Sequence, residues 1–445
     1  MTADWRQLRA AQDMAGADAA LAAALAAAPD DPELVMMQAQ LRFERGLPAA
    51  ALFARAAALD PANREARRNH ALALAAEGDP AGAEAVLTMA IARWPDWLDG
   101  LRVLASLRWV AGDGAAFDRD WARAARAHPS QPGLWLGWFG ALAQARDWAR
   151  AGAVLDEAQA QLGETPAILS ARAFMAGEAG ALDACAALLA RLSADDPFLQ
   201  LARVRLALRR GDPAAARDQA LAMLRGPGAR QAWSYLATAW RLLDDPLADW
   251  LEGDPAFVRA HAVGLSNADL AELGEVLRAL HTAQQAYAEQ SVRHGTQTDR
   301  SVLLRHEPVF ARTKAALLDA VERHVAGLPP PDPRHPLLSV PRTGLRIAGS
   351  WSVRLGPGGF NVAHSHPMGW LSSAFYVSLP EAEPAPAGHF QWGAPPAELG
   401  LDLPPRGLIA PVPGQLVLFP AYVWHGTVPI TRGERLNLAF DVVPA

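Results

Sequence analysis

The sequence predicts a multidomain α + β protein, in which an α-helical solenoid is followed by a β-sheet domain. Three observations support this fold class. Before about residue 240, Ala, Leu and Arg dominate and apolar residues recur at helical spacing. The same stretch repeats with a fixed period. After about residue 338, β-branched and aromatic residues form short runs that Gly and Pro interrupt, as in strands joined by turns.

Composition narrows the classes of protein that the chain can belong to. It has 445 residues, of which 51% are hydrophobic and 20% charged, which predicts a folded chain of two or three domains. A formal net charge of −6 argues against a general nucleic-acid binder. No apolar run reaches the roughly 20 residues of a membrane span, and residues 1–5 show no export signal. We therefore expect a cytoplasmic protein.

The helical half repeats every 34 residues, as the positions of Pro61, Pro95 and Pro129 indicate. Each period carries a small residue and, four positions later, a large apolar one; examples are Ala49/Phe53, Ala83/Leu87 and Ala151/Leu155. This pattern resembles the tetratricopeptide repeat (TPR), a pair of helices that cross where the small residue lies. About six units fit between residues 16 and 230. Cys185, the single cysteine, takes a small-residue position, so we expect it to be buried rather than nucleophilic.

Three regions follow from these patterns. Residues 1–240 form the predicted repeat domain, whose concave groove we expect to bind a protein or peptide substrate. Residues 241–337 form a predicted helical connector that packs on the β domain, with helices expected at 267–283 and 308–326. The polar stretch 290–298 between these helices is predicted to be a surface loop. Residues 338–445 form the predicted β domain.

Nine of the twelve histidines follow residue 280, and the positions of three of them relative to predicted strands indicate a shared site. His364 and His366 are two residues apart, so on a strand both side chains would point to one face. His425 follows a predicted strand over 415–419, and Arg435 begins another alternating strand. Imidazole suits Fe, Zn, Cu and Ni, and the guanidinium fork matches a carboxylate. The pattern predicts a metal site beside an anion site.

Five stretches together resemble a bacterial family of 2-oxoglutarate/Fe(II) oxygenases with N-terminal tetratricopeptide repeats. They are Gln290–Thr298, Gly349–Arg354, His364–Ala374, Trp424–Pro429 and Arg435–Pro444. The resemblance implies a double-stranded β-helix, a jelly-roll or cupin-like barrel, with buttressing helices. It also implies Fe(II) as the metal, 2-oxoglutarate as cosubstrate, and O2.

The resemblance also assigns roles to residues. Its metal ligands correspond to His364, His366 and His425, and its cosubstrate-binding cation corresponds to Arg435. Further candidates for binding the cosubstrate are Ser373, Tyr376, Asn437 and Arg354. For Arg354 the equal alternative is a salt bridge on the barrel surface, and for Asn437 it is a hydrogen bond within the strand.

The sequence departs from the usual pattern at His366, where the wider superfamily has a carboxylate ligand. All three histidines can bind iron, which is the arrangement we expect. Alternatively, His364 and His425 bind while His366 lies outside the coordination shell. In a third arrangement, His366 leads the motif and water replaces the carboxylate, as in the aspartyl/asparaginyl β-hydroxylases.

The function expected from these features is hydroxylation of a protein or peptide that the repeats recruit. One alternative is a cupin-like metalloenzyme that uses Zn, Mn or Ni without 2-oxoglutarate; such an enzyme has no need of a carboxylate clamp at Arg435. A second is a TPR scaffold whose β domain has lost catalysis. A small-molecule substrate also remains open, and the sequence does not determine the oligomeric state.

Overall fold

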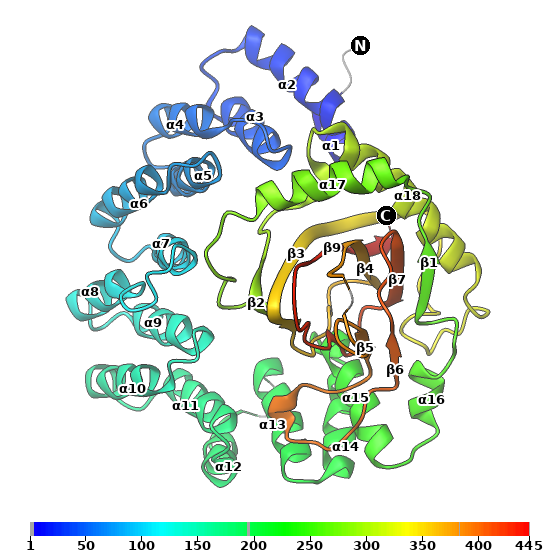
Figure 1. Cartoon of the computed structure of the whole chain (residues 1–445). Helices are drawn as coiled ribbons and strands as arrows, with labels where there is room; N and C mark the ends of the chain where they lie inside the picture. The colour runs from blue at the N-terminus through cyan, green and yellow to red at the C-terminus, as the bar shows by residue number, and fades with distance from the viewer. Residues whose placement is uncertain (1–3, 194–195, 382, 445) are drawn as a thin grey trace. The chain divides into compact units, whose positions relative to one another are not determined.

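The computed structural model describes residues 4–193, 196–381 and 383–444, so part of the N-terminal stretch examined for an export signal lies outside the described residues (Figure 1). The chain forms two compact units, residues 1–147 with 300–312, and residues 148–299 with 313–445. The domain boundaries expected at residues 240 and 337 stay a prediction. The two units reflect which residues pack together, and not where helices give way to strands. None of the described helices combines the length and apolar composition needed to cross a membrane.

The first unit is built of consecutive helices. Their bounds are α1 Trp5–Ala10, α2 Met14–Ala27, α3 Pro32–Glu44, α4 Ala50–Leu59, α5 Arg64–Ala76, α6 Pro80–Arg93, α7 Leu98–Val110, α8 Arg119–Ala127 and α9 Pro132–Gln144. From α5 on, every second helix begins 34 residues after the last, at Arg64, Leu98 and Pro132. The predicted helix-pair period is therefore present.

The second unit continues the same series before its sheets begin. Its helices are α10 Trp148–Leu162, α11 Pro166–Glu178, α12 Leu182–Ala190, α13 Pro197–Arg209, α14 Pro213–Met223, α15 Ala229–Leu242 and α16 Leu247–Glu252. Cys185 is 2% exposed and packs with Ala173, Leu189 and Leu199, which confirms its expected burial.

Helix starts and turns in the repeats have local causes. Asp31 precedes α3, and its carboxylate accepts the backbone N–H groups of Glu33 and Leu34, while Pro32 occupies the first helical position. The turn between the helices of a pair needs a left-handed residue. Gly112 supplies it with φ +89°, and at the equivalent place Arg146 takes φ +59° despite its side chain.

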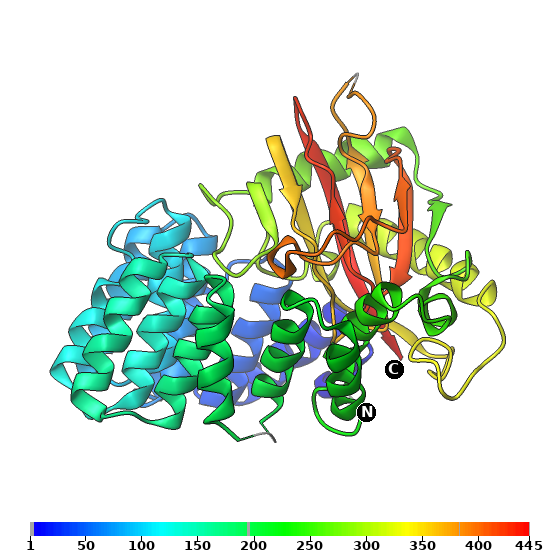
Figure 2. The same ribbon diagram turned by 90° about the horizontal axis from the view of Figure 1, so that it is seen from below.

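The chain after α16 forms two antiparallel sheets. The major sheet has the order β1-β7-β4-β9-β3-β2, and the minor sheet has the order β6-β5-β8. The strands of the major sheet lie side by side in Figure 2. Their bounds are β1 Arg259–Ala262, β2 Val292–Gln297, β3 Leu345–Asn361, β4 Leu371–Ser378, β7 Gln415–Pro420 and β9 Arg435–Pro444. Those of the minor sheet are β5 Phe390–Trp392, β6 Gly407–Ile409 and β8 His425–Thr427. The α + β class is confirmed.

The region predicted to be a helical connector also contains strands. Its two helices are present as α17 Asn267–Leu280 and α18 Pro308–Ala326, but β1 and β2 lie in it as well. The prediction of a surface loop over 290–298 is wrong, because β2 pairs with β3, with Thr296 opposite Arg354. A polar stretch can form an edge strand when a long neighbour supplies the hydrogen bonds, and that neighbour is distant in sequence.

The two faces of the major sheet have different environments. One face, here called the inner face, packs against the minor sheet, where Ala374, Tyr376, Val417 and Phe419 form one buried cluster with Phe390 of β5. The other, the outer face, is covered by α17, which contacts β4. Since residues opposite each other in an antiparallel pair share a face, the register decides which side chains reach the space between the sheets.

Candidate metal centre

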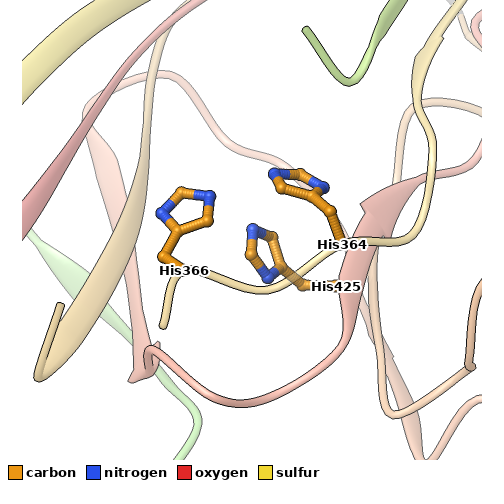
Figure 3. A group of neighbouring side chains, drawn as sticks. All are labelled: His364, His366 and His425. Atoms are coloured by element: carbon orange, nitrogen blue, oxygen red, sulfur yellow. The ribbon is translucent and has the colours of Figure 1, made fainter. Parts of the chain in front are cut away.

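The imidazole rings of His364, His366 and His425 converge (Figure 3). One ring nitrogen of each lies within 4.8 Å of those of the other two. The centroids of the His364 and His425 rings are 4.3 Å apart. A metal about 2.1 Å from three nitrogens sets them about 3 to 3.5 Å apart. Small ring movements would therefore complete a site for one ion, and the three histidines can hold iron.

Backbone pairing, and not a shared strand, brings the three histidines together. β3 ends at Asn361, so the expectation that His364 and His366 project from one strand is wrong. Instead, His364 and His425 exchange two backbone hydrogen bonds of 3.0 Å, and the N–H of His366 donates to the carbonyl of Ala421 at 2.8 Å. The segment after β3 is thereby fixed alongside the start of β8.

Each ring has its Nδ1 beside an oxygen acceptor. Nδ1 of His364 is 2.8 Å from the carbonyl of Val362, and Nδ1 of His425 is 3.0 Å from that of Val423. Because a carbonyl oxygen can only accept, Nδ1 carries the hydrogen in both rings. The lone pair is then on Nε2, so Nε2 is the atom available to a metal.

The third ring is held by a carboxylate. Nδ1 of His366 lies 2.8 Å from Oδ1 of Asp441 and 2.9 Å from the hydroxyl of Ser372. Asp441 and Ser372 are opposite each other in the β4–β9 pair, so both lie on the inner face. This contact leaves Nε2 of His366 available as well, and it places a negative charge next to the cluster.

Burial keeps two of the rings uncharged. Burial lowers the pKa of His364 to about 3, and the neighbouring His366 contributes to this shift. Burial also lowers the pKa of His425 well below its usual range, with His364 and His366 adding to the effect. Neutral imidazole is the form that binds metal. The site therefore needs no proton release from these two rings to accept a cation.

Arg435 is a further candidate residue on the inner face, where it is opposite Leu355 of β3. It is 2% exposed, and its guanidinium carbon lies 5.0 Å from the ring centroid of Tyr376. Among the described residues, Nε and Nη1 of Arg435 are buried without a hydrogen-bond partner. An unpaired buried cation is costly. The donor set fits a carboxylate, which would give this buried guanidinium a charged acceptor.

Asn437 accompanies this pair, and two other predicted residues do not. Asn437 is opposite Tyr376 on the inner face, and its side-chain oxygen is buried and lacks a partner among the described residues. Ser373 is on the outer face, where its hydroxyl donates to the carbonyl of Phe440 at 2.8 Å. Arg354 is opposite Leu436 on the outer face and pairs with Glu434 at 2.6 Å. The structure therefore does not place Ser373 or Arg354 with Arg435.

Sequence reasoning missed the residues that surround the rings. Alternation along β9 puts Asp441 on the same face as Arg435, but it does not reveal that His366 is its partner. Near His364, the amide of Asn361 donates to the hydroxyl of Ser291 at 3.0 Å. That hydroxyl lies 3.5 Å from Nε2 of His364. These contacts depend on β2, which the sequence did not predict.

Residues 349–441 match the model of a protein family described as "Putative 2OG-Fe(II) oxygenase". This segment matches a 2OG-Fe(II) oxygenase family. The oxygenase segment, as residues 349–441 are called below, contains the three histidines, Arg435 and Asp441. The predicted resemblance to 2-oxoglutarate/Fe(II) oxygenases agrees with this match. So do the predicted cofactors, Fe(II) and 2-oxoglutarate.

Solved structures similar to the chain include both oxygenases and repeat proteins. A viral collagen prolyl hydroxylase from Paramecium Bursaria Chlorella virus-1, in complex with 2OG, is 12% identical, with a TM-score of 0.30 over 42% of this chain and 97% of that one. A Pseudomonas putida prolyl-4-hydroxylase is 18% identical, with a TM-score of 0.31 over 45% and 96%. A tetratricopeptide repeat protein from Parabacteroides merdae is 15% identical, with a TM-score of 0.35 over 48% and 88%. No curated protein matches the chain.

Proposed function

We propose that the chain is an Fe(II)- and 2-oxoglutarate-dependent oxygenase that hydroxylates a protein or peptide. The observation that carries this proposal is the pairing of two features within the oxygenase segment. The three histidines bring ring nitrogens within 4.8 Å of one another, and Arg435 has buried donors on the inner face that lack a partner among the described residues. We also propose that the two packed antiparallel sheets form a double-stranded β-helix.

Each residue has a defined role in this proposal. His364, His366 and His425 bind the iron through Nε2. Arg435 binds the distal carboxylate of 2-oxoglutarate, and the Tyr376 ring beside the guanidinium keeps it in place. Bound iron with 2-oxoglutarate and O2 supplies the oxidant that hydroxylates a C–H bond.

Apolar rings border the metal ligands on one side. The ring centroid of Phe419 lies 4.4 Å from that of His425, and the ring of Phe390 is stacked against His425 at 6.0 Å. Both phenylalanines are buried. They exclude water from this side of the centre, which strengthens the electrostatic interactions there.

We favour the arrangement with three histidine ligands. Asp441 holds His366 at Nδ1, as backbone carbonyls hold His364 and His425 at Nδ1. In all three rings, Nε2 is therefore the nitrogen available to a metal. Asp441 supplies, through His366, the negative charge that a carboxylate ligand would bring directly. The second arrangement, with His366 outside the coordination shell, gives no reason for this anchoring.

We propose that the helical repeats recruit the substrate. The 34-residue period and the buried small residue of each pair support this, since such solenoids bind extended partners. Of the alternative functions, a metalloenzyme without 2-oxoglutarate gives no reason for the buried Arg435, two of whose nitrogens lack a partner in the described part of the chain. A scaffold without catalysis gives no reason for three anchored imidazoles.

The test is oxygen-dependent succinate formation. The full chain is loaded with Fe(II) without oxygen, given 2-oxoglutarate and then O2, and succinate is measured over time. We expect slow turnover even without the hydroxylated partner, and none in His425→Ala. His128→Ala is the matched control, because His128 is exposed and lies in the first unit. Undiminished succinate formation by His425→Ala would overturn the proposal.

A further inference from the structure

The repeat helix α15 contacts both segments that carry the three histidines. We infer that Ser234 on this helix is a positioning residue for the metal centre. The inference rests on the proposed metal site, but it concerns a residue that lies outside the oxygenase segment.

One hydroxyl group joins the two ligand segments. Ser234 is 1% exposed, and its hydroxyl donates to the carbonyl of Tyr422 at 2.6 Å. The same oxygen lies 3.0 Å from the hydroxyl of Ser365. Tyr422 precedes His425 by three residues, and Ser365 stands between His364 and His366. Ser234 therefore fixes the spacing between the segment with two ligands and the segment with the third.

The backbone of the same residue anchors the tryptophan next to His425. Nε1 of Trp424 donates to the carbonyl of Ser234 at 3.0 Å and lies 3.0 Å from the hydroxyl of Thr238. The ring of Tyr235 meets the Trp424 ring edge-on, with centroids 5.3 Å apart. Trp424 and His425 are adjacent, so α15 also determines where the chain enters β8.

Further contacts extend along the helix. Arg230 donates to the carbonyl of Met368 at 3.4 Å, close to the His366 segment. Arg241 donates to the carbonyl of Pro404 at 2.6 Å and also to that of Gly393. The N–H of Gly393 in turn donates to the carbonyl of Trp424 at 2.7 Å. The loops around the ligands are thus held from one side by α15.

The sequence of α15 explains this role. Arg230, Ser234, Thr238 and Arg241 follow a spacing of four, four and three, which places them on one face of a helix. Both Ser234 and Thr238 are 1% exposed. Burying hydroxyl groups is unfavourable unless they are hydrogen-bonded. The Ser234 hydroxyl donates to the segment that carries His425, and the Thr238 hydroxyl accepts from Trp424 while donating to the carbonyl of Ser234 at 3.0 Å. The helix is therefore matched to the ligand-bearing segments and not only to its neighbouring helices.

Cobalt binding tests the inference without relying on catalysis. Co(II) is titrated into the full chain, and its dissociation constant and visible spectrum are recorded for the wild type, Ser234→Ala and Ser170→Ala. Ser170 is the matched control, because its hydroxyl also lies on a repeat helix but, among the described residues, donates to the carbonyl of Pro166 of its own helix at 2.8 Å. We expect Co(II) to bind about tenfold more weakly to Ser234→Ala, with a changed spectrum. Ser170→Ala should behave like the wild type.

A second variant covers the case in which Ser234→Ala does not fold. Ser365→Ala removes the other hydroxyl of the contact, and we expect it to weaken Co(II) binding in the same direction. Wild-type affinity and spectrum in a folded Ser234→Ala or in Ser365→Ala would overturn the inference while leaving the metal site intact. A wild-type chain that binds no Co(II) would instead contradict the metal site itself, and the inference with it.

Discussion

Asp441 on β9 lies 2.8 Å from Nδ1 of His366, so a carboxylate stands directly behind a proposed metal ligand. The usual oxygenase pattern has its carboxylate at the position that His366 occupies here. In this chain, the negative charge comes from another strand and reaches the centre through an imidazole. The hydroxyl of Ser372, 2.9 Å from the same nitrogen, helps to orient the ring.

The substitution Asp441→Asn tests this relationship. We expect it to weaken metal binding by about 10- to 100-fold, because a partner that anchors a ligand ring typically contributes this much. Metal affinity is measured by competition with a chelator of known strength. Asp402→Asn is the control, because Asp402 is exposed. Equal metal affinity in Asp441→Asn and the wild type would show that Asp441 has no part in the centre.

The substitution Arg435→Gln should separate cosubstrate binding from metal binding. We expect the affinity for 2-oxoglutarate to fall by about 100-fold, roughly 2.7 kcal/mol, because the charge-assisted bonds to its carboxylate are lost. Metal affinity should change little. Anaerobic calorimetry with Mn(II) in place of Fe(II) measures both. Unchanged 2-oxoglutarate affinity would favour a metalloenzyme that does not use this cosubstrate.

The same substitution makes a prediction about stability. The guanidinium of Arg435 is buried with two nitrogens that lack partners among the described residues, and burial lowers its pKa. Removing such a charge should not destabilise the ligand-free protein. We expect the Tm of ligand-free Arg435→Gln to equal or exceed that of the wild type. A marked fall in Tm would mean that the guanidinium is already satisfied.

Stability should fall on acidification because of His324. His324 is 1% exposed, and this burial is the main cause that lowers its pKa to about 3. The nearby His261 is the second cause. Between this value and the ordinary 6.5, the unfolded chain binds a proton that the folded chain does not, so the free energy of unfolding increases with pH. The contribution of His324 reaches its full value above about pH 6.5. The contribution amounts to about 2 to 3 kcal/mol between pH 6.5 and 4.5.

Comparison with His324→Asn isolates this effect. Urea unfolding at several pH values gives the free energy of unfolding of both proteins. The wild type should lose more stability than the variant as the pH falls from 6.5 to 4.5, because other titrating groups are common to both. Parallel pH profiles would show that His324 titrates in the folded protein as it does in the unfolded chain.

Cys185 should be unreactive in the native protein. It is 2% exposed, and burial raises the pKa of its thiol, so little thiolate is present or accessible. We expect alkylation by iodoacetamide to be slow in buffer and complete in denaturant, as read by intact mass. Rapid modification of the native chain would contradict the structural role assigned to this residue in its repeat.

The repeats could be predicted from sequence because their signals are local and periodic. Small and large residues recur at fixed offsets, so degenerate units such as the one with Cys185 were still placed correctly. β2 could not be predicted, because its stability comes from pairing with β3 and not from its own polar residues.

The site was predictable in part, because residue types and short spacings are also local signals. The types and spacing of His364, His366, His425 and Arg435 identified them as candidates, but the convergence of the histidines comes from the His364–His425 backbone bridge. Ser373 was assigned to the site although it lies on the outer face. β4 is buried on both faces over Leu371–Val377, so its residues do not alternate in polarity and do not reveal which serine points inward.

The number of Fe(II) ions bound per chain tests the central claim most directly. Anaerobic Fe(II) titration of the full chain should give about one ion for the wild type, and replacing any one of His364, His366 and His425 with Ala should weaken binding by at least about 100-fold, consistent with each ring being a ligand. A wild-type chain that binds no ion, or a His366→Ala variant with wild-type affinity, would contradict a centre built from all three imidazoles.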